Sequence, residues 1–175
     1  MPVHAFVDET KVRGLLVVAA VLQPRDLAGS RAVMRQFLLP RQSHIHFVKE
    51  KPDRKGQIVD AVARLPVRLD VYDATGIRDA RAARRACLER IVQDLAAEDA
   101  HRLVIEQDDS LIRSDREVLY HAVRASGVDS SLVYEHMTAR MEPLLWIPDA
   151  AAWCWTKGKS WRRRIEPLVR RVIEV

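Results

Sequence analysis

The chain alternates short apolar runs with longer stretches of helical period. Residues 3–7 and 103–105 are short apolar runs, and residues 14–22 are almost wholly apolar, which is typical of a buried strand. Residues 67–72 alternate between apolar and polar side chains, which indicates an edge or half-buried strand. A further short strand is expected at 132–135. The pattern therefore predicts about five strands.

Prolines and glycines mark where the intervening helices begin and end. Pro24 and Pro52 stand in expected first turns, where a missing N–H is tolerated, and Gly127 follows an expected helix end. Ser114 and Glu117 have the spacing of a capping box. The helices are expected at 24–37, 52–64, 79–98, 114–125 and 148–155.

This order of elements predicts a mixed α/β sheet in one domain over residues 1–158. The first two strands follow one another directly and should pair antiparallel. The later strands are joined through helices and should run parallel. We expect helices on both faces of the sheet, and a helical insertion at residues 24–64, after the second strand.

The composition is typical of a soluble globular protein, with 175 residues of which 48% are hydrophobic and 30% charged. No apolar stretch is long enough to span a bilayer, and the N-terminus lacks the pattern of a signal peptide. Cys87 and Cys154 are too few and too far apart for a disulfide framework or a zinc site. We therefore expect a cytoplasmic protein with reduced thiols and no membrane partner.

The formal net charge of +5 is located at the end of the chain. Residues 157–175 contain seven basic and two acidic side chains, which equals the whole excess. A basic segment favours contact with a nucleic-acid backbone. The alternative is a solvated amphipathic helix with Pro167 in its first turn. In both cases we expect residues 159–175 to be helical and packed on the domain.

Three acidic residues follow the expected strands at positions where one edge of the sheet could gather them. Asp8 ends the first strand, Glu106 ends the strand at 103–105, and Asp149 lies in the first turn of the helix after the last strand. Each alone is explained by a turn or by the helix dipole. Together they indicate a carboxylate site at the carboxyl ends of the strands.

Three short motifs resemble a known group. Phe6–Thr10 (Phe-Val-Asp-Glu-Thr), Ile45–Phe47 (Ile-His-Phe) and Trp146–Ala150 (Trp-Ile-Pro-Asp-Ala) are similar to segments of the bacterial domain-of-unknown-function 3800 family. The resemblance extends over most of the chain and implies a ribonuclease H-like fold. The order of strands and helices agrees with that arrangement independently.

The chain departs from the family pattern at three positions. His44 stands where the family often has an acid, Glu106 stands where it often has Asp, and Pro148 precedes the late Asp. The first two differences leave the number of metal ions, one or two, open. Enzymes of this fold tend to carry an acid on the helix after the third strand. Glu89 is the obvious candidate, but it lies opposite the apolar stripe and is expected to face solvent.

These acids predict a nuclease that hydrolyses phosphodiester bonds with a divalent metal. Asp8, Glu106 and Asp149 are expected to bind Mg²⁺ or Mn²⁺, because hard cations prefer carboxylate oxygens. A bound ion would polarise a phosphoryl oxygen and activate a water molecule. Histidine side chains can gain or lose a proton near neutral pH, so His46 is the candidate for moving a proton. It could equally be a packed, hydrogen-bonded histidine.

Further side chains are assigned supporting roles. The candidates for substrate binding are Lys49, Trp161, Arg162 and Arg163, and those for orienting the metal ligands are Glu9 and Glu50. Strand alternation places Glu9 on the opposite face from Asp8, unless the strand has already ended. Lys49 and Glu50 could also belong to a solvated helix start.

Two other classes of protein remain open from the sequence. One is a catalytically silent nucleic-acid-binding module on the same fold. The other is a protein-interaction module that uses the C-terminal segment as a docking helix. There is no glycine-rich phosphate loop and no Gly-x-Ser-x-Gly motif, which argues against an NTPase and a serine hydrolase.

Overall fold

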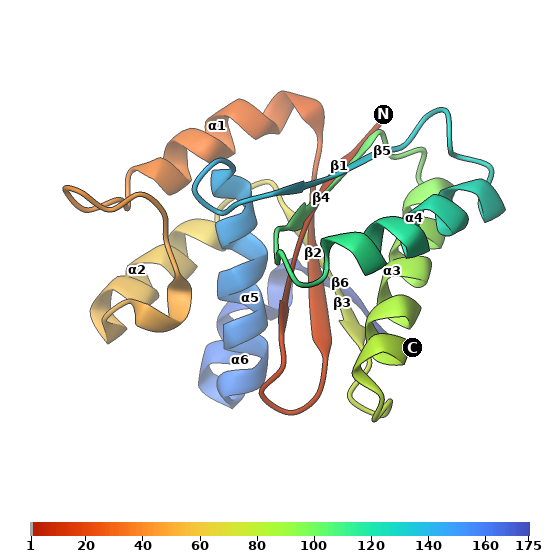
Figure 1. Ribbon diagram of the computed structural model, residues 1–175. Helices are drawn as coiled ribbons and strands as arrows, with labels where there is room; N and C mark the ends of the chain where they lie inside the picture. Colours follow the sequence, from red (N-terminus) through yellow and green to blue (C-terminus); the bar gives the residue numbers. More distant parts are fainter. Residues whose placement is uncertain (1) are drawn as a thin grey trace.

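The computed structural model describes residues 2–175 and contains one six-stranded sheet (Figure 1). The strand order is β5-β4-β1-β2-β3-β6. The strands are β1 (His4–Thr10), β2 (Leu16–Leu22), β3 (Arg68–Asp73), β4 (Arg102–Glu106), β5 (Val133–Met137) and β6 (Val169–Glu174).

The strand directions confirm a mixed α/β sheet. β1 and β2 form an antiparallel hairpin, and β3 pairs antiparallel with β2. β4 is parallel to β1 and β5 is parallel to β4, so the carboxyl ends of these three strands meet at one edge. In the hairpin, Gly14 has φ +97°, and a side chain there would meet the backbone of Thr75.

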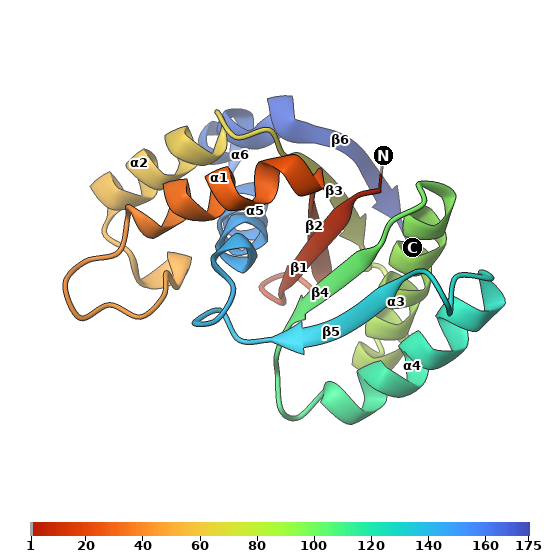
Figure 2. The ribbon, with the colours of Figure 1, turned by 90° about the horizontal axis from the view of Figure 1, so that it is seen from above.

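Helices cover both faces of the sheet, as expected (Figure 2). α1, α2, α5 and α6 lie on one face, and α3 and α4 lie on the other. The helices are α1 (Pro24–Arg35), α2 (Pro52–Val62), α3 (Ala80–Ala97), α4 (Ile112–Ala125), α5 (Trp146–Lys157) and α6 (Lys159–Ile165), with short 3₁₀ turns η1 (Phe47–Lys49), η2 (Pro143–Leu145) and η3 (Glu166–Leu168). None of the helices in residues 2–175 has the length and hydropathy to cross a membrane.

The predicted capping box of α4 does not form. The helix already begins at Ile112, and the Ser114 hydroxyl donates a hydrogen bond to the Leu111 carbonyl at 3.0 Å. Because the helix starts earlier, Ser114 lies inside its first turn and not at the N-cap position, so its side chain does not cap the helix. α3 does have a side-chain cap, because Asp79 accepts a hydrogen bond from the Ala82 N–H at 2.7 Å.

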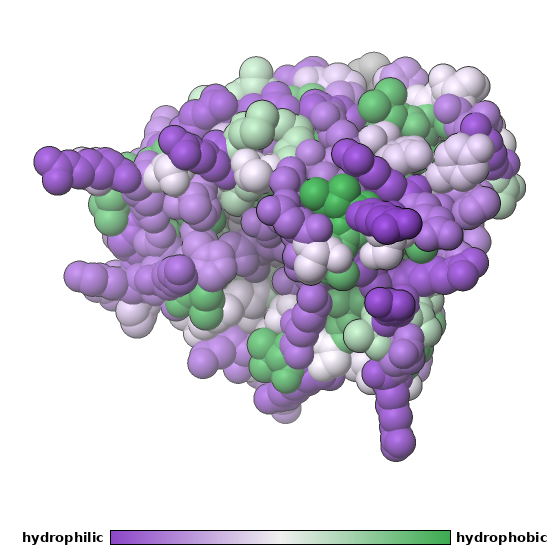
Figure 3. Space-filling view, in the orientation of Figure 1, coloured by the Kyte–Doolittle hydropathy of each residue, from purple (hydrophilic) through white to green (hydrophobic). Residues whose placement is uncertain are grey.

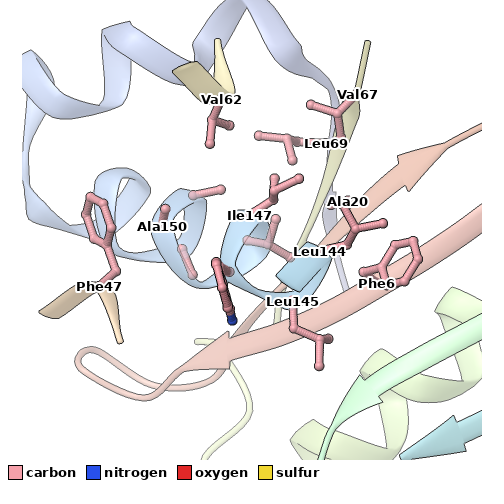
Figure 4. Close-up of a cluster of buried hydrophobic side chains, with 14 of the residues drawn as sticks. Phe6, Ala20, Phe47, Val62, Val67, Leu69, Leu144, Leu145, Ile147 and Ala150 are labelled. Atoms are coloured by element: carbon pink, nitrogen blue, oxygen red, sulfur yellow. The ribbon is translucent and has the colours of Figure 1, made fainter. Parts of the chain in front are cut away.

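Alternation along the central strand β1 builds two separate cores. Phe6 packs on the α5 side, whereas Val7 packs on the α3 side. Figure 4 shows Leu144, Ile147 and Ala150 of the η2–α5 segment among core side chains from the sheet and from η1. α5 is therefore seated directly on the face of β1 to which Phe6 and, two residues later, Asp8 belong.

The C-terminal segment corrects two predictions. α6 ends at Ile165, η3 contains Pro167, and residues 169–174 form the sixth strand, parallel to β3. Pro167 interrupts the helical ladder, and the following β-branched residues favour an extended chain. The segment is thus not helical throughout, and its second half is an edge strand of the sheet, not a docking helix.

Ion pairs attach β6 to the domain. The Arg170 and Arg171 guanidinium groups donate to the buried Asp70 of β3 at 2.9 and 3.1 Å. Both also reach Glu98, at the end of α3. These two arginines account for part of the basic charge near the C-terminus, and their role is structural.

Candidate active site

The fold brings the three predicted carboxylates together. Asp8 lies near the end of β1 and Glu106 ends β4, which pairs in parallel with β1. Asp149 lies in the first turn of α5, which packs on the same face. The Asp8 and Glu106 carboxyl groups can share a proton when one of them is protonated, and the charges of Glu106 and Asp149 both act on Asp8. We call Asp8, Glu106 and Asp149 the carboxylate cluster.

Burial and crowding favour the protonated form of Asp8. Burial, the hydrogen bond with Glu106 and the charges of Glu106 and Asp149 raise the pKa of Asp8 well above its usual range. The Glu9 N–H donates to Asp8 at 2.7 Å, which opposes that rise only in part. The carboxylate cluster therefore contains more negative charge than its surroundings compensate.

Asp149 is perturbed in the same direction. Burial raises its pKa to about 6, with a further contribution from the Glu106 charge. The Phe47 N–H donates to Asp149 at 2.9 Å and lowers the pKa, as does the charge of His46. The same hydrogen bond ties the η1 segment to the start of α5.

The chemistry of the cluster fits a hard divalent cation. Its donors are carboxylate oxygens from three different elements, and a cation would offset the burial and the repulsion that raise the pKa values of Asp8 and Asp149. Across residues 2–175, no three His, Cys, Asp or Glu side chains are already grouped as metal ligands. Binding would therefore require Asp8 to lose its proton and the carboxylates to turn toward the ion.

Glu9 faces the other side of the sheet, because β1 continues to Thr10. Its carboxylate pairs with Arg84 of α3, and with Lys11 at 3.0 Å. Only the backbone N–H of Glu9 contacts Asp8. The side chain is thus placed away from the carboxylate cluster, and the predicted orienting role falls to the main chain.

A buried ion-pair network that the sequence analysis missed extends from Glu9. Arg84 donates to both oxygens of Asp115 in α4, at 2.5 and 2.7 Å, and His136 of β5 lies 2.9 Å from Asp115. Burial raises the pKa of Asp115, but hydrogen bonds from Arg84 and His136 outweigh it and lower the pKa. No spacing rule connects these residues, since they belong to four separate elements. We call Glu9, Arg84, Asp115 and His136 the ion-pair network.

A pocket of about 600 Å³ opens at the carboxyl ends of β1 and β4. Asp8, Glu9, Arg84 and Glu106 contribute polar groups to its wall. Its apolar lining comes from Val7, Val17, Cys87, Leu88 and Ile105. Burial raises the pKa of Cys87 to about 12, so this thiol is not a nucleophile at neutral pH.

The segment that contains His46 lies beside the cluster. The His46 side chain is exposed, which contradicts the alternative of a packed core histidine, and its charge acts on Asp149. Lys49 is also exposed. Glu50 is placed elsewhere: its carboxylate accepts hydrogen bonds from Gln42 and Arg54, each at 2.6 Å, and so holds the 37–54 segment together.

The predicted substrate-binding residues of α6 differ in how many contacts they make within the protein. Arg162 donates twice to the Trp155 carbonyl, at 2.9 and 2.7 Å. Trp161 packs edge-on against Trp153, with ring centroids 5.1 Å apart, and the Arg164 guanidinium lies over its ring. Arg163 is exposed. Glu89 pairs with Arg85 at 2.7 Å, on the outer side of α3.

Comparison with known proteins supports the fold. No protein-family model matches the sequence, so the similarity to the domain-of-unknown-function 3800 family stays a prediction. No curated protein matches it either. Among solved structures, the chain is similar to RNase HII in the PCNA:RNase HII complex from Archaeoglobus fulgidus, with a TM-score of 0.52 and 16% sequence identity. The match covers 94% of this chain and 75% of that chain, and it shows a ribonuclease H-like fold.

Proposed function

We propose that the protein is a nuclease that hydrolyses phosphodiester bonds with Mg²⁺ or Mn²⁺ held by the carboxylate cluster. The observation that carries this proposal is the convergence of Asp8, Glu106 and Asp149 at one edge of the sheet, where the pKa values of Asp8 and Asp149 are raised. Within residues 2–175, none of the three carboxylates forms a salt bridge with a lysine or arginine. The ribonuclease H-like fold and the structural similarity to RNase HII support it.

The roles of the residues follow from their placement. Asp8, Glu106 and Asp149 would hold one or two ions, which when bound would polarise a phosphoryl oxygen and lower the pKa of a water molecule. The Glu9 N–H and the Phe47 N–H keep Asp8 and Asp149 oriented by hydrogen bonds of 2.7 and 2.9 Å. His46, exposed beside Asp149, would donate a proton to the leaving oxygen. Lys49 would contact a neighbouring phosphate.

The test is cleavage of labelled single- and double-stranded DNA and RNA in Mg²⁺, Mn²⁺ or EDTA. We expect the wild-type protein to cleave at least one substrate only when metal is present. Asp8→Asn and Asp149→Asn should each lose cleavage by roughly a hundredfold or more, because each removes a charged ligand. Asp53→Asn, an exposed acid at the start of α2, is the matched control and should cleave like the wild type.

The alternative is a catalytically silent binding module on the same fold. One observation favours it: the pKa of Asp8 is raised well above its usual range, so Asp8 and Glu106 can share a proton without any ion. Nucleic-acid binding without metal-dependent cleavage, unchanged in both Asn variants, would support the binding module and contradict the nuclease.

A further inference from the structure

Two lysine-containing segments that are far apart in the sequence meet at Trp153. The chain has only six lysines, and five of them fall in residues 49–55 and 157–159. The fold joins these two segments, because the ammonium groups of Lys55 and Lys157 lie 4.9 and 5.5 Å from the centre of the Trp153 ring. We call Lys49, Lys51, Lys157, Lys159 and Trp153 the lysine–tryptophan surface.

The charge of this surface is not neutralised internally. Within the described residues 2–175, no ion pair forms at any of these four lysines, and all four are exposed. Some arginines contrast with them, since Arg54, Arg84 and Arg170 pair with carboxylates. Figure 3 shows that the face seen in Figure 1 is mostly hydrophilic, with hydrophobic residues in small separate patches. Free positive charge on such a surface favours a polyanionic partner.

One helix connects this surface with the carboxylate cluster. Asp149, Trp153 and Lys157 follow one another at intervals of four residues along α5, so they share one face of the helix. The distance along the axis from Asp149 to Lys157 is about 12 Å. Trp153 is partly exposed, and its ring is held edge-on by Phe47 at 5.3 Å and by Trp161 at 5.1 Å.

We propose that the lysine–tryptophan surface binds single-stranded nucleic acid and leads it along α5 to the carboxylate cluster. This surface would supply the substrate to the site of the proposed function. That the strand continues to the carboxylate cluster rests on the proposed function. The lysines contact backbone phosphates, and the Trp153 ring stacks with one base. Lys157 has a flexible stem, so its ammonium group moves from the ring to a phosphate when the base arrives.

The aromatic side chain selects the single strand over the duplex. Stacking on Trp153 requires a base whose face is free, and in a duplex both faces are covered by neighbouring base pairs. The lysines alone would not discriminate, because phosphates are present on both forms. Nothing on this surface distinguishes ribose from deoxyribose, so DNA and RNA strands are both expected to bind.

Binding is measured in EDTA, so that cleavage does not interfere, by the fluorescence anisotropy of labelled oligonucleotides. The probes are single-stranded DNA, the same sequence as RNA, and the DNA duplex. We expect both single strands to bind more tightly than the duplex, and to quench the tryptophan fluorescence of the protein. Equal or tighter binding of the duplex would overturn the inference.

Two variants separate the phosphate contacts from the stacking. Lys157→Gln/Lys159→Gln should weaken single-strand binding by roughly tenfold and flatten the plot of log K against log [salt] by about 1.4, since each phosphate contact contributes about 0.7. Trp153→Leu should weaken binding by roughly five- to a hundredfold without changing that slope, because stacking releases no counterions.

Arg116→Gln/Arg124→Gln is the matched control, because it removes the same charge from exposed positions of α4, on the opposite face. It should bind like the wild type. If the lysine variant and this control behave alike, the inference is wrong even where cleavage is observed. If Trp153→Leu fails to fold, the inference is tested by the lysine variant and by the fluorescence quenching of the wild-type protein. Binding on this surface without any cleavage would support the inference and contradict the nuclease.

Discussion

Two neighbouring acids of β1, Asp8 and Glu9, have opposite surroundings. Strand alternation directs Asp8 to the α5 side and Glu9 to the α3 side. Asp8 meets two further acids, and its pKa is raised. Glu9 meets the Arg84 guanidinium and Lys11. The chain thus places an acidic cluster and a balanced ion-pair network on the two faces of one strand.

This difference separates a candidate ligand site from a structural one. In the ion-pair network each buried carboxylate has a cationic or hydrogen-bonding partner, and such networks hold elements in register. In the carboxylate cluster like charges are brought together at a cost to stability. Residues kept in a destabilising arrangement at the edge of a sheet are candidates for binding a ligand of opposite charge.

The largest expected effect comes from breaking the ion-pair network. Arg84→Met leaves Glu9 and the buried Asp115 without their shared cation. We expect the free energy of unfolding to fall by about 3–5 kcal/mol, as for other broken buried pairs. Urea denaturation measures the change. Arg85→Met, which breaks an exposed pair with Glu89 on the same helix, should denature like the wild type.

In the carboxylate cluster, removing a charge should stabilise the folded protein, whereas in the ion-pair network it should destabilise it. Because the folded-state pKa of Asp149 is about 6, above the ordinary value of 3.8, the folded state binds the proton more tightly than the unfolded state. The resulting stabilisation is complete below about pH 4 and is lost as the pH rises through about 6. Its size is on the order of 3 kcal/mol.

Asp149→Asn tests this expectation, because asparagine carries no charge and still accepts the Phe47 hydrogen bond. The variant should be more stable than the wild type at pH 7, and the difference should shrink towards pH 4. Thermal unfolding followed at several pH values measures both. Mg²⁺ should raise the unfolding temperature of the wild type at pH 7 and leave the variant unchanged. If the difference in stability between the variant and the wild type does not change with pH, the charged form of Asp149 does not destabilise the folded protein.

Removing one partner of Asp115 should have a smaller effect. His136→Leu deletes the hydrogen bond of 2.9 Å to a buried carboxylate but leaves both bonds from Arg84 in place. We expect a loss of about 1.5–2 kcal/mol in urea denaturation. His121→Leu, an exposed position on α4, controls for the loss of an imidazole group. Equal stability of the two variants would mean that His136 is not part of the network.

The smallest effect is expected at Lys11. Its ion pair with Glu9 is largely exposed to solvent, with 61% of the lysine side chain accessible. Lys11→Ala should therefore lower the free energy of unfolding by about 0.2–1 kcal/mol, and salt should reduce the difference. A loss as large as that of Arg84→Met would show that Lys11, and not Arg84, neutralises Glu9.

Strand and helix positions followed from the sequence wherever periodicity was strong. The apolar run at 14–22 became the fully buried strand β2, and the long helix became α3. The C-terminal strand was not predicted, because Ile165, Leu168, Val169 and Val172 fit helical spacing as well as a turn and a strand. Two features favour the strand over the helix. Pro167 interrupts the helix, and Arg170 and Arg171 form ion pairs with Asp70, about a hundred residues away in the chain.

The candidate site shows the same division. Asp8, Glu106 and Asp149 were recognisable because each follows a strand or begins a helix, and parallel topology brings such positions to one edge. His46 was proposed from a motif, and the structure places it beside Asp149. Arg84, Asp115 and His136 carry no such local signal. Each resembles an ordinary surface residue in sequence, although Asp115 is buried.

The sequence by itself determined the order of the strands and long helices through α5, the strand-ending acids and the excess of basic residues near the C-terminus. Only the tertiary structure decided which acid is balanced and which is not, and which basic residues remain free. Local pattern reflects interactions between residues close in the chain, such as backbone hydrogen bonding and periodic burial. Charge compensation depends on partners from distant elements, and these partners are known only after the sheet and its helices have packed.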